Sequence, residues 1–277
     1  MNAVLVWDDD LIEIGFGRRM FEIFEKKGLS YEHSPSGIDN ISVDIILSFD
    51  KSSNQNDIVK LIKLFPEHIS LYNISIEKKT KLHKIIEAGE YKPISEERMN
   101  ENYLYAVNKL KNAGYIHYEI SNLAKSERMR SRHNINCWKH NEYIGIGINA
   151  SGYLKCKRYS NTPNIKEFIK MVQNGRRPAT YEEEIDRQKC LSEEIMLGLR
   201  MLEGLDIKAF NEKHGIDIRE LIIKSNTERY FDINNKKIAF NYNGILISDY
   251  LILNFIELAE KAVKKNRVIG DNREIGL

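Results

Sequence analysis

The chain has 277 residues, of which 42% are hydrophobic, so it can bury a sizeable core in one large or two medium domains. Its formal net charge of +2 gives no electrostatic argument for nucleic acid or for an acidic membrane as a partner. Three widely spaced cysteines (Cys137, Cys156 and Cys190) exclude a disulfide framework and suit a reducing compartment. We find neither a signal peptide nor an apolar run near the roughly 20 residues of a membrane span, and therefore expect a cytoplasmic protein.

The first half of the chain alternates segments with strand and helix patterns. Strands are predicted at residues 3–6, 41–47, 69–76 and 118–121, and helices at 9–27, 58–65 and 96–113. Ser95 is suited to cap the last of these helices, and Gly114 to end it in a left-handed conformation. The alternation predicts parallel βα units, and a strand that starts so early implies a missing partner upstream.

The second half is predicted to hold another extended segment and then a separate domain. Residues 155–160 are predicted to be extended, 165–172 to be helical, and 174–178 to be a linker, so we place domains at 1–177 and 178–264, with a tail at 265–277. Thr180 and Glu183 have capping-box spacing, which predicts a helix from there through Leu199. Further helices are predicted at 207–214, 218–230 and 249–263, with a hairpin of 236–240 and 245–247 around a turn at 242–244. Helices with a hairpin suggest a winged-helix-like module.

Reactive and conformationally unusual residues gather between these two halves. Ser131–Trp138 contains a histidine, a thiol and an indole, and Tyr143–Ala150 contains a Gly-x-Gly. Binding residues concentrate on connections that rigid elements position, and glycines let a ligand approach the backbone. The two segments are therefore the candidate ligand site.

Several blocks of the chain resemble, in the same order, the radical-SAM proteins that include oxygen-independent coproporphyrinogen oxidase and the HemW-type heme chaperones. The blocks are Glu67–Tyr72 with Ile76 and Glu77, Tyr118–Asn122, His133 and Asn134 with Trp138, Tyr143–Gly147, and Leu197–Arg200 with Glu203 and Gly204. The resemblance implies an α/β fold: a partial TIM-like barrel of parallel βα units, followed by a small α+β winged-helix-like C-terminal domain.

The same resemblance implies cofactors that this sequence is not equipped to hold. Family members bind a [4Fe-4S] cluster on a Cys-x3-Cys-x2-Cys loop, which leaves one iron free for S-adenosylmethionine. No cysteine here matches that loop, so we expect a barrel without its cluster loop and no radical-SAM catalysis by this chain alone. Other family positions differ as well: Trp7 and Ser48 stand where relatives have polar or glycine residues.

Part of the family's cofactor pattern survives near the middle of the chain. Gly145, Gly147 and Ala150 match positions that bind cofactor in relatives, although Ile148 and Ser151 depart from the pattern. The two glycines could instead relieve crowding where a barrel closes. Glu77 also matches a family position at a strand end, but a surface carboxylate is the simpler interpretation.

The heme-chaperone members carry a His-Asn-x-x-Tyr-Trp motif associated with heme binding. This chain keeps His133, Asn134 and Trp138 and has Cys137 in place of the tyrosine. The resemblance thus implies heme binding by these four residues, since an imidazole or a thiolate can ligate heme iron and an indole can cover a porphyrin. Two other interpretations are a structural histidine with a packed tryptophan, and a zinc site formed by His133, Cys137 and His140.

Three functions follow from these observations. The first is a heme chaperone-like protein that transfers heme to an acceptor protein; the second is a porphyrinogen oxidase-type radical enzyme whose cluster-binding part is missing from this chain. The third is a non-catalytic interaction module, which could bind nucleic acid through cations in the C-terminal domain: Lys224, Arg229, Lys236 and Lys237. A barrel that lacks its first strands would also leave an open edge, which predicts a homodimer.

Overall fold

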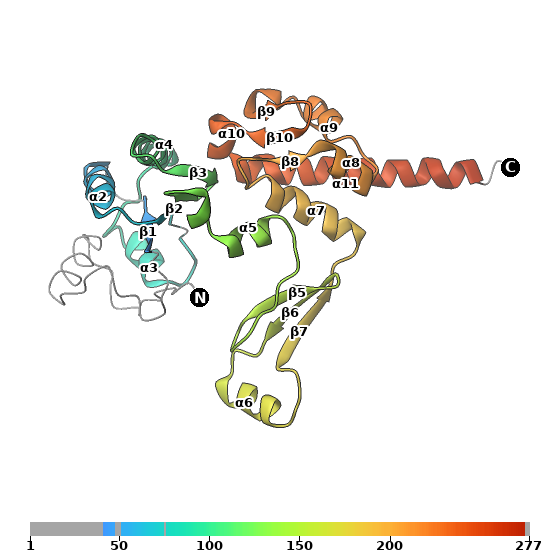
Figure 1. Ribbon diagram of the computed structural model, residues 1–277, viewed down its shortest axis with the longest axis horizontal. Coiled ribbons are helices and arrows are strands. Elements are labelled where there is room, and N and C mark those ends of the chain that lie inside the picture. Colours follow the sequence, from blue (N-terminus) through green and yellow to red (C-terminus); the bar gives the residue numbers. More distant parts are fainter. Residues whose placement is uncertain (1–40, 48–50, 75, 275–277) are drawn as a thin grey trace. The chain divides into compact units, whose positions relative to one another are not determined.

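The computed structural model describes residues 41–47, 51–74 and 76–274 (Figure 1). The chain divides into two compact units, and the boundary along the chain lies between Arg130 and Ser131. The strand predicted at 3–6 and the helix predicted at 9–27 lie outside the described residues, and with them the predicted open edge. The domain boundary expected at residue 178 lies inside the second unit. That boundary and the homodimer stay predictions.

Unit 1, the part of the chain up to Arg130, contains a four-stranded sheet in the order β1-β2-β4-β3. Its strands are β1 (Ser42–Ile46), β2 (His68–Tyr72), β3 (Ile116–Glu119) and β4 (Asn122–Ala124). The first two are parallel, as the predicted βα unit requires, whereas β4 is antiparallel to both of its neighbours. A connection of only two residues separates β3 from β4, and so short a link joins antiparallel strands alone.

Helices of unit 1 follow the strands in the predicted alternation. They are α2 (Lys51–Leu64), α3 (Lys81–Glu87) and α4 (Glu96–Asn112), with a 3-10 turn η1 (Glu127–Met129). The hydroxyl of Ser95 accepts a hydrogen bond from the backbone N–H of Arg98, and Gly114 follows α4 with φ +89°, so both predicted helix ends are confirmed. The fully buried side chains of α2 and α4 pack together beside the sheet: Ile58, Leu61, Val107 and Leu110.

The half-buried imidazole of His117 makes the stability of unit 1 sensitive to acid. Its Nε2 lies 3.3 Å from the carbonyl oxygen of Ile120, and burial lowers the pKa of His117 from 6.5 to about 4. The unfolded chain therefore binds this proton more readily, so stability is lost as the pH falls below 6.5. Between pH 7 and pH 5 we expect a loss of about 2 kcal/mol in urea unfolding, and a smaller loss in His117→Gln. Equal losses in both proteins would contradict this assignment.

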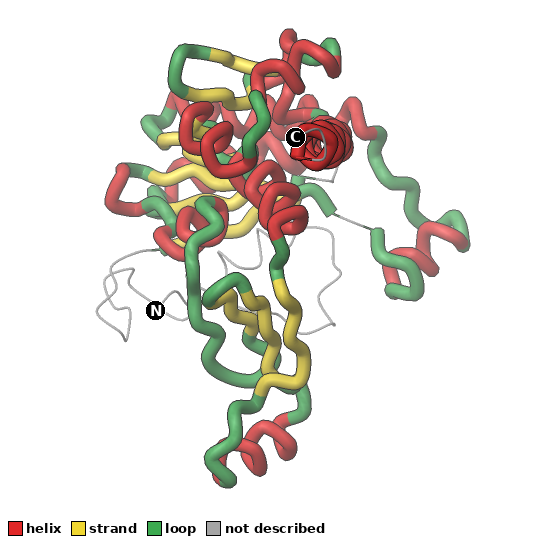
Figure 2. Tube along the Cα trace, turned by 90° about the vertical axis from the view of Figure 1, so that its right-hand side faces the viewer, coloured by secondary structure: helices red, strands yellow, loops and turns green. Residues whose placement is uncertain are grey.

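Unit 2 begins with α5 (Arg132–Trp138) and continues into an antiparallel arm. Figure 2 shows the strands of this arm in yellow. The arm consists of three strands in the order β5-β6-β7 and a helix between the last two: β5 (Ser151–Leu154), β6 (Lys157–Asn161), α6 (Ile165–Gln173) and β7 (Ala179–Glu184). The helix agrees with the sequence prediction. It lies at the free end of the three strands (Figure 1).

The capping box predicted at Thr180 and Glu183 is wrong, because both residues belong to β7. This strand pairs with β6 from Ala179 to Glu184, with a register shift at Thr180, and the pairing satisfies backbone groups that a first helical turn would leave open. The helix starts later, where the carboxylate of Asp186 accepts a hydrogen bond from the N–H of Lys189 at 2.8 Å. A local capping signal was thus overridden by pairing with a distant strand.

The remainder of unit 2 has the connectivity of a winged helix. Its elements are α7 (Arg187–Gly198), β8 (Leu205–Asp206), α8 (Ile207–His214), α9 (Ile218–Ser225), η2 (Glu228–Tyr230), β9 (Phe231–Ile233) and β10 (Lys237–Phe240), followed by α10 (Tyr242–Leu246) and α11 (Ser248–Glu274). The three strands form an antiparallel sheet in the order β8-β10-β9. Buried aromatic rings fill its core, with Phe231 against both Phe240 and Phe255. No helix in the described ranges is both long and apolar enough to cross a membrane.

The predicted hairpin of residues 236–240 and 245–247 is also wrong in its second strand. β10 pairs with β9 and β8, and the residues after it form α10. The residues of the predicted turn at 242–244 are the start of α10, which is capped by the side chain of Asn241 as it accepts a hydrogen bond from the N–H of Gly244. The wing is therefore formed by the strands on either side of Asn234.

Candidate functional site

The segment with the reactive residues folds as the short helix α5, at the start of unit 2. The hydroxyl of Ser131 accepts a hydrogen bond from the N–H of Asn134 at 3.3 Å and thereby caps the helix. Residues four apart on a helix lie one above the other. The helical conformation therefore pairs His133 with Cys137, and Asn134 with Trp138.

His133 and Cys137 form the chemically distinctive pair of α5. Their Nε2 and Sγ atoms are 3.8 Å apart, His133 is exposed, and Cys137 is half-buried. The ring of Tyr143 meets His133 edge to face, with 6.0 Å between ring centres. Burial raises the pKa of the Cys137 thiol, which therefore keeps its proton at neutral pH. The helix thus presents an accessible imidazole next to a protonated thiol.

Trp138 holds the end of α5 against the residues that follow α7. The guanidinium of Arg200 lies over the indole ring, 4.7 Å from its centre, an arrangement typical of a cation–π contact. The indole Nε1 is buried and has no hydrogen-bond partner among the described residues. These contacts support the packing interpretation of Trp138. Ligand contact by Trp138 and Asn134 stays a prediction.

The backbone N–H of His140 bonds to the carbonyl oxygen of Cys137 at 2.9 Å, but the His140 imidazole contacts other side chains. Its Nε2 is 2.9 Å from Oε2 of Glu193, and its ring stacks on that of Tyr153 at 4.8 Å. Burial lowers the pKa of His140, and the neighbouring Glu193 only partly offsets this effect. Within the described ranges, no three or more His, Cys, Asp or Glu side chains are arranged to hold a metal ion. The zinc hypothesis is therefore not supported.

The glycines of the Tyr143–Ala150 segment have structural roles in the arm. A side chain on Gly145 would come within 2.2 Å of the carbonyl oxygen of Ser151, so the close backbone approach requires glycine. Gly147 has φ +109°, and its carbonyl oxygen accepts a hydrogen bond from the Asn161 amide at 2.8 Å. The close approach at Gly145 supports the crowding interpretation, whereas Gly147 has open space around it and is needed for its positive φ. Cofactor binding by Gly145, Gly147 and Ala150 stays a prediction.

Tyr143 and Arg200 contact α5 through side chains to which the sequence analysis assigned no role. Both lie within blocks that carry the family resemblance, but nothing in the local pattern showed that their side chains approach α5. Tyr143 reaches His133 because its backbone pairs with Tyr153 through two hydrogen bonds, of 2.8 and 2.9 Å. Only this long-range pairing turns the tyrosine toward the helix.

Three of the four predicted cations of the winged-helix region, all except Lys236, have side-chain partners among the described residues of the same region. Lys224 pairs with Glu220 at 2.8 Å, and Lys237 with a carboxylate of Glu203 at 3.6 Å. The guanidinium of Arg229 lies over the ring of Tyr230. Paired cations are typical of a solvated surface, and nucleic-acid binding usually needs a free basic patch.

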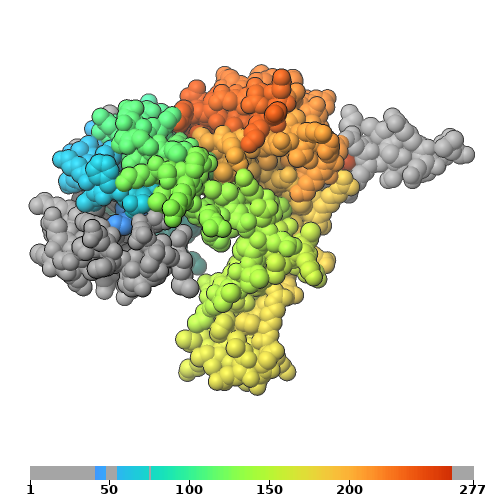
Figure 3. All heavy atoms as spheres, viewed as in Figure 1, coloured from blue at the N-terminus to red at the C-terminus, as the bar shows by residue number. Residues whose placement is uncertain are grey.

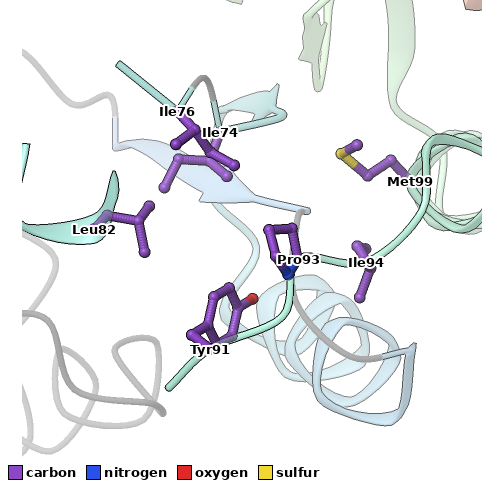
Figure 4. Close-up of a pocket in the computed structure, with 7 residues that line it drawn as sticks. All are labelled: Ile74, Ile76, Leu82, Tyr91, Pro93, Ile94 and Met99. Carbon is purple, nitrogen blue, oxygen red and sulfur yellow. The ribbon is translucent and has the colours of Figure 1, made fainter. Parts of the chain in front are cut away.

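Unit 1 contains a small apolar pocket beyond the end of β2 (Figure 4). Its lining is mostly aliphatic and comes from the segment before α3, from α3, from the connection to α4 and from the start of α4: Ile74, Ile76, Leu82, Tyr91, Pro93, Ile94 and Met99. Glu77 follows this lining directly in the chain and is exposed. The lining offers no set of convergent polar groups, so it defines no chemistry of its own.

Two comparisons define the class of protein. Residues 185–230 match the model of the HemN C-terminal domain, which covers α7 to η2. The whole fold is similar to that of coproporphyrinogen III oxidase (HemN) from Escherichia coli, a radical SAM enzyme, with a TM-score of 0.59 and 14% identity over 88% of this chain and 58% of that one. The fold is therefore that of the radical-SAM HemN class, as the sequence blocks predicted.

Relatives of known family narrow this class further. The chain is 30% identical to the heme chaperone HemW of Bacillus subtilis, over 77% of this chain and 56% of that protein. It is also 30% identical to HemW of Lactococcus lactis, over 74% of this chain and 53% of that protein. The chain belongs to the HemW-type family and spans about half the length of these relatives.

The described residues do not fit the iron–sulfur cluster that the family implies. Three thiolates from one loop would be needed. Cys137 lies on α5, Cys156 in the turn between β5 and β6, and Cys190 on α7, and all three are free thiols. Burial raises the pKa values of Cys137 and Cys190, which opposes the thiolate form that metal binding requires.

Proposed function

We propose that this chain is a heme chaperone-like protein that binds heme as cargo on α5 and transfers it to an acceptor protein. The observation that carries the proposal is the pair of donor atoms on one helix face, with the exposed imidazole of His133 3.8 Å from the Cys137 thiol. Membership of the HemW-type family supports the same function.

The exposure of the His133 imidazole suits transfer better than permanent retention. A protein that keeps its heme usually encloses it in a pocket, whose burial slows release. Here His133 is exposed and α5 is only seven residues long, so bound heme would stay accessible to an acceptor. Trp138, fixed beneath Arg200, would give the short helix a rigid attachment.

The two donors are expected to act in different pH ranges. His133 offers a nitrogen ligand to ferric heme near neutral pH, as imidazoles do in many heme proteins. Cys137 has a raised pKa, so its thiolate becomes available only in alkaline solution. We therefore assign His133 as the ligand at neutral pH and Cys137 as a second donor as the pH rises.

A spectroscopic heme titration of the purified full chain tests the proposal. At neutral pH we expect a saturable Soret shift of the nitrogen-ligated type, with a thiolate contribution that grows as the solution is made alkaline. Cys137→Ser should remove the alkaline change alone. Absence of a saturable Soret shift would refute heme binding. Transfer is then measured by mixing the loaded chain with an apo-hemoprotein.

A second candidate, a porphyrinogen oxidase-type radical enzyme, is favoured by the similarity of the fold to coproporphyrinogen III oxidase. It requires a [4Fe-4S] cluster that the described residues do not fit. Iron and sulfide analysis of anaerobically reconstituted protein distinguishes the two functions. Stoichiometric iron and sulfide, together with reductive cleavage of S-adenosylmethionine, would favour the enzyme.

A further inference from the structure

The helix at the end of the arm carries an apolar face that the described chain leaves exposed. Ile165, Ile169 and Val172 recur at helical spacing and are 56%, 48% and 51% exposed. None of the nine residues of α6 is buried. Long aliphatic side chains at this spacing normally face a core. In α6 the apolar face, which an amphipathic helix usually buries, is exposed instead.

Additional aliphatic residues belong to the same end of the arm. Asn149 donates its backbone N–H to the carbonyl oxygen of Thr162 at 3.1 Å, and the Asn161 amide bonds to the Gly147 carbonyl oxygen. These bonds attach the Ile144–Asn149 loop to the start of α6, and Ile146 in that loop is 88% exposed. We call residues 144–149 and 164–177 the arm tip.

Positive charge surrounds the apolar face of the arm tip. Residues 164–177 of the tip contain four cations (Lys166, Lys170, Arg176 and Arg177) and one acid, Glu167. Glu167 accepts a hydrogen bond from Thr162 at 2.8 Å, and Arg177 pairs with Glu182 at 2.9 Å. The other three cations have no acidic partner in the described part of the chain. Exposed aliphatic residues thus alternate with unpaired cations.

We propose that the arm tip docks on the surface of an anionic lipid bilayer. An amphipathic helix with lysines on its polar face lies in the headgroup region, where aliphatic side chains enter the acyl boundary and cations contact lipid phosphates. Figure 3 shows the tip, in yellow, as a rounded projection, and a bilayer needs no shape complementarity from it. This inference goes beyond heme transfer and does not depend on it.

Contact between two copies through the same surface is disfavoured by charge. A twofold contact would place the unpaired cations of one α6 against those of the other, and like charges facing each other oppose association. Specific protein interfaces also bury roughly 800 Å² on each partner, far more than a nine-residue convex helix offers. A bilayer avoids the charge repulsion, because its headgroups supply the opposite charge, and it does not require the contact area of a specific protein interface.

Vesicle co-sedimentation of the full chain tests the proposal. We expect binding to vesicles of phosphatidylcholine mixed with phosphatidylglycerol, weaker binding in high salt, and little binding to pure phosphatidylcholine. Each cation near an anionic surface contributes about fivefold in affinity, so Lys166→Gln with Lys170→Gln should bind about 25-fold more weakly. Ile165→Ser with Ile169→Ser should reduce binding about tenfold or more.

Ile223→Ser is the matched control, because Ile223 is 64% exposed on α9, outside the arm tip. It should bind mixed vesicles as the unchanged chain does. The proposal is overturned if the unchanged chain ignores mixed vesicles, or if both tip variants bind them normally. It is equally overturned if sedimentation velocity shows self-association that the Ile165 and Ile169 changes abolish, since the tip would then join two copies.

Discussion

Replacing His133 with alanine is expected to weaken heme binding by the full chain at least about tenfold at neutral pH and to remove the Soret shift. Loss of a residue that only hydrogen-bonds to a metal ligand typically weakens metal binding ten- to hundredfold. The loss of His133 should cost at least as much, because His133 is assigned as the ligand itself. The nearest remaining donor, the Cys137 thiol, has a raised pKa and stays protonated at that pH. Absorbance titration with hemin measures the change.

His83→Ala provides a matched control for this experiment. His83 also lies on a short helix, α3, and pairs with Glu87 four residues on, with 3.2 Å between Nδ1 and the carboxylate. Its removal should leave heme binding unchanged. If His133→Ala binds heme as tightly as the unchanged chain does, while His83→Ala does not, the assignment of the ligand to α5 is wrong.

Gly204→Ala is expected to destabilise unit 2 by about 4 kcal/mol. Gly204 has φ +71°, which costs a residue with a side chain roughly 1–2 kcal/mol. An added Cβ would also come within 2.1 Å of the carbonyl oxygen of Ile238, on the central strand β10, and such overpacking costs about 1–3 kcal/mol more. The backbone of β10 cannot retreat without breaking its pairing with β8 and β9.

Gly215→Ala separates these two contributions, because Gly215 has nearly the same conformation and open space around it. Its φ is +69°, and nothing lies within 4 Å of an added Cβ. We expect a loss of about 1 kcal/mol from the conformational cost alone. Urea unfolding followed by circular dichroism compares the variants. Similar losses at Gly204 and Gly215 would show that β10 yields to the added methyl group.

Features that depend on a few neighbouring residues were predictable from sequence. The caps of α4 are an example, since Ser95 and Gly114 satisfy backbone groups at the ends of that one helix. Helix α8 occupies the predicted residues because its apolar face and its Gly215 end are both local signals. The family blocks likewise predicted the radical-SAM type of fold.

Features that depend on distant partners were not predictable. Thr180 to Glu183 resembled a helix start but joined β6 as a strand, because backbone pairing across the arm outweighs one capping interaction. In the candidate site, the sequence has His133 four residues before Cys137 and His140 three residues after it. Tertiary contacts separated them, since Glu193 and Tyr153 hold His140.

The sequence by itself determined which donor groups this chain has and that His133 and Cys137 are four residues apart. Only the tertiary structure decided that this spacing falls on a helix, which brings Nε2 and Sγ within 3.8 Å and leaves the imidazole accessible. The physical reason is that the distance between two side chains four residues apart depends on the conformation of the backbone between them. Here that conformation rests on the Ser131 cap and on the Trp138 contact with Arg200.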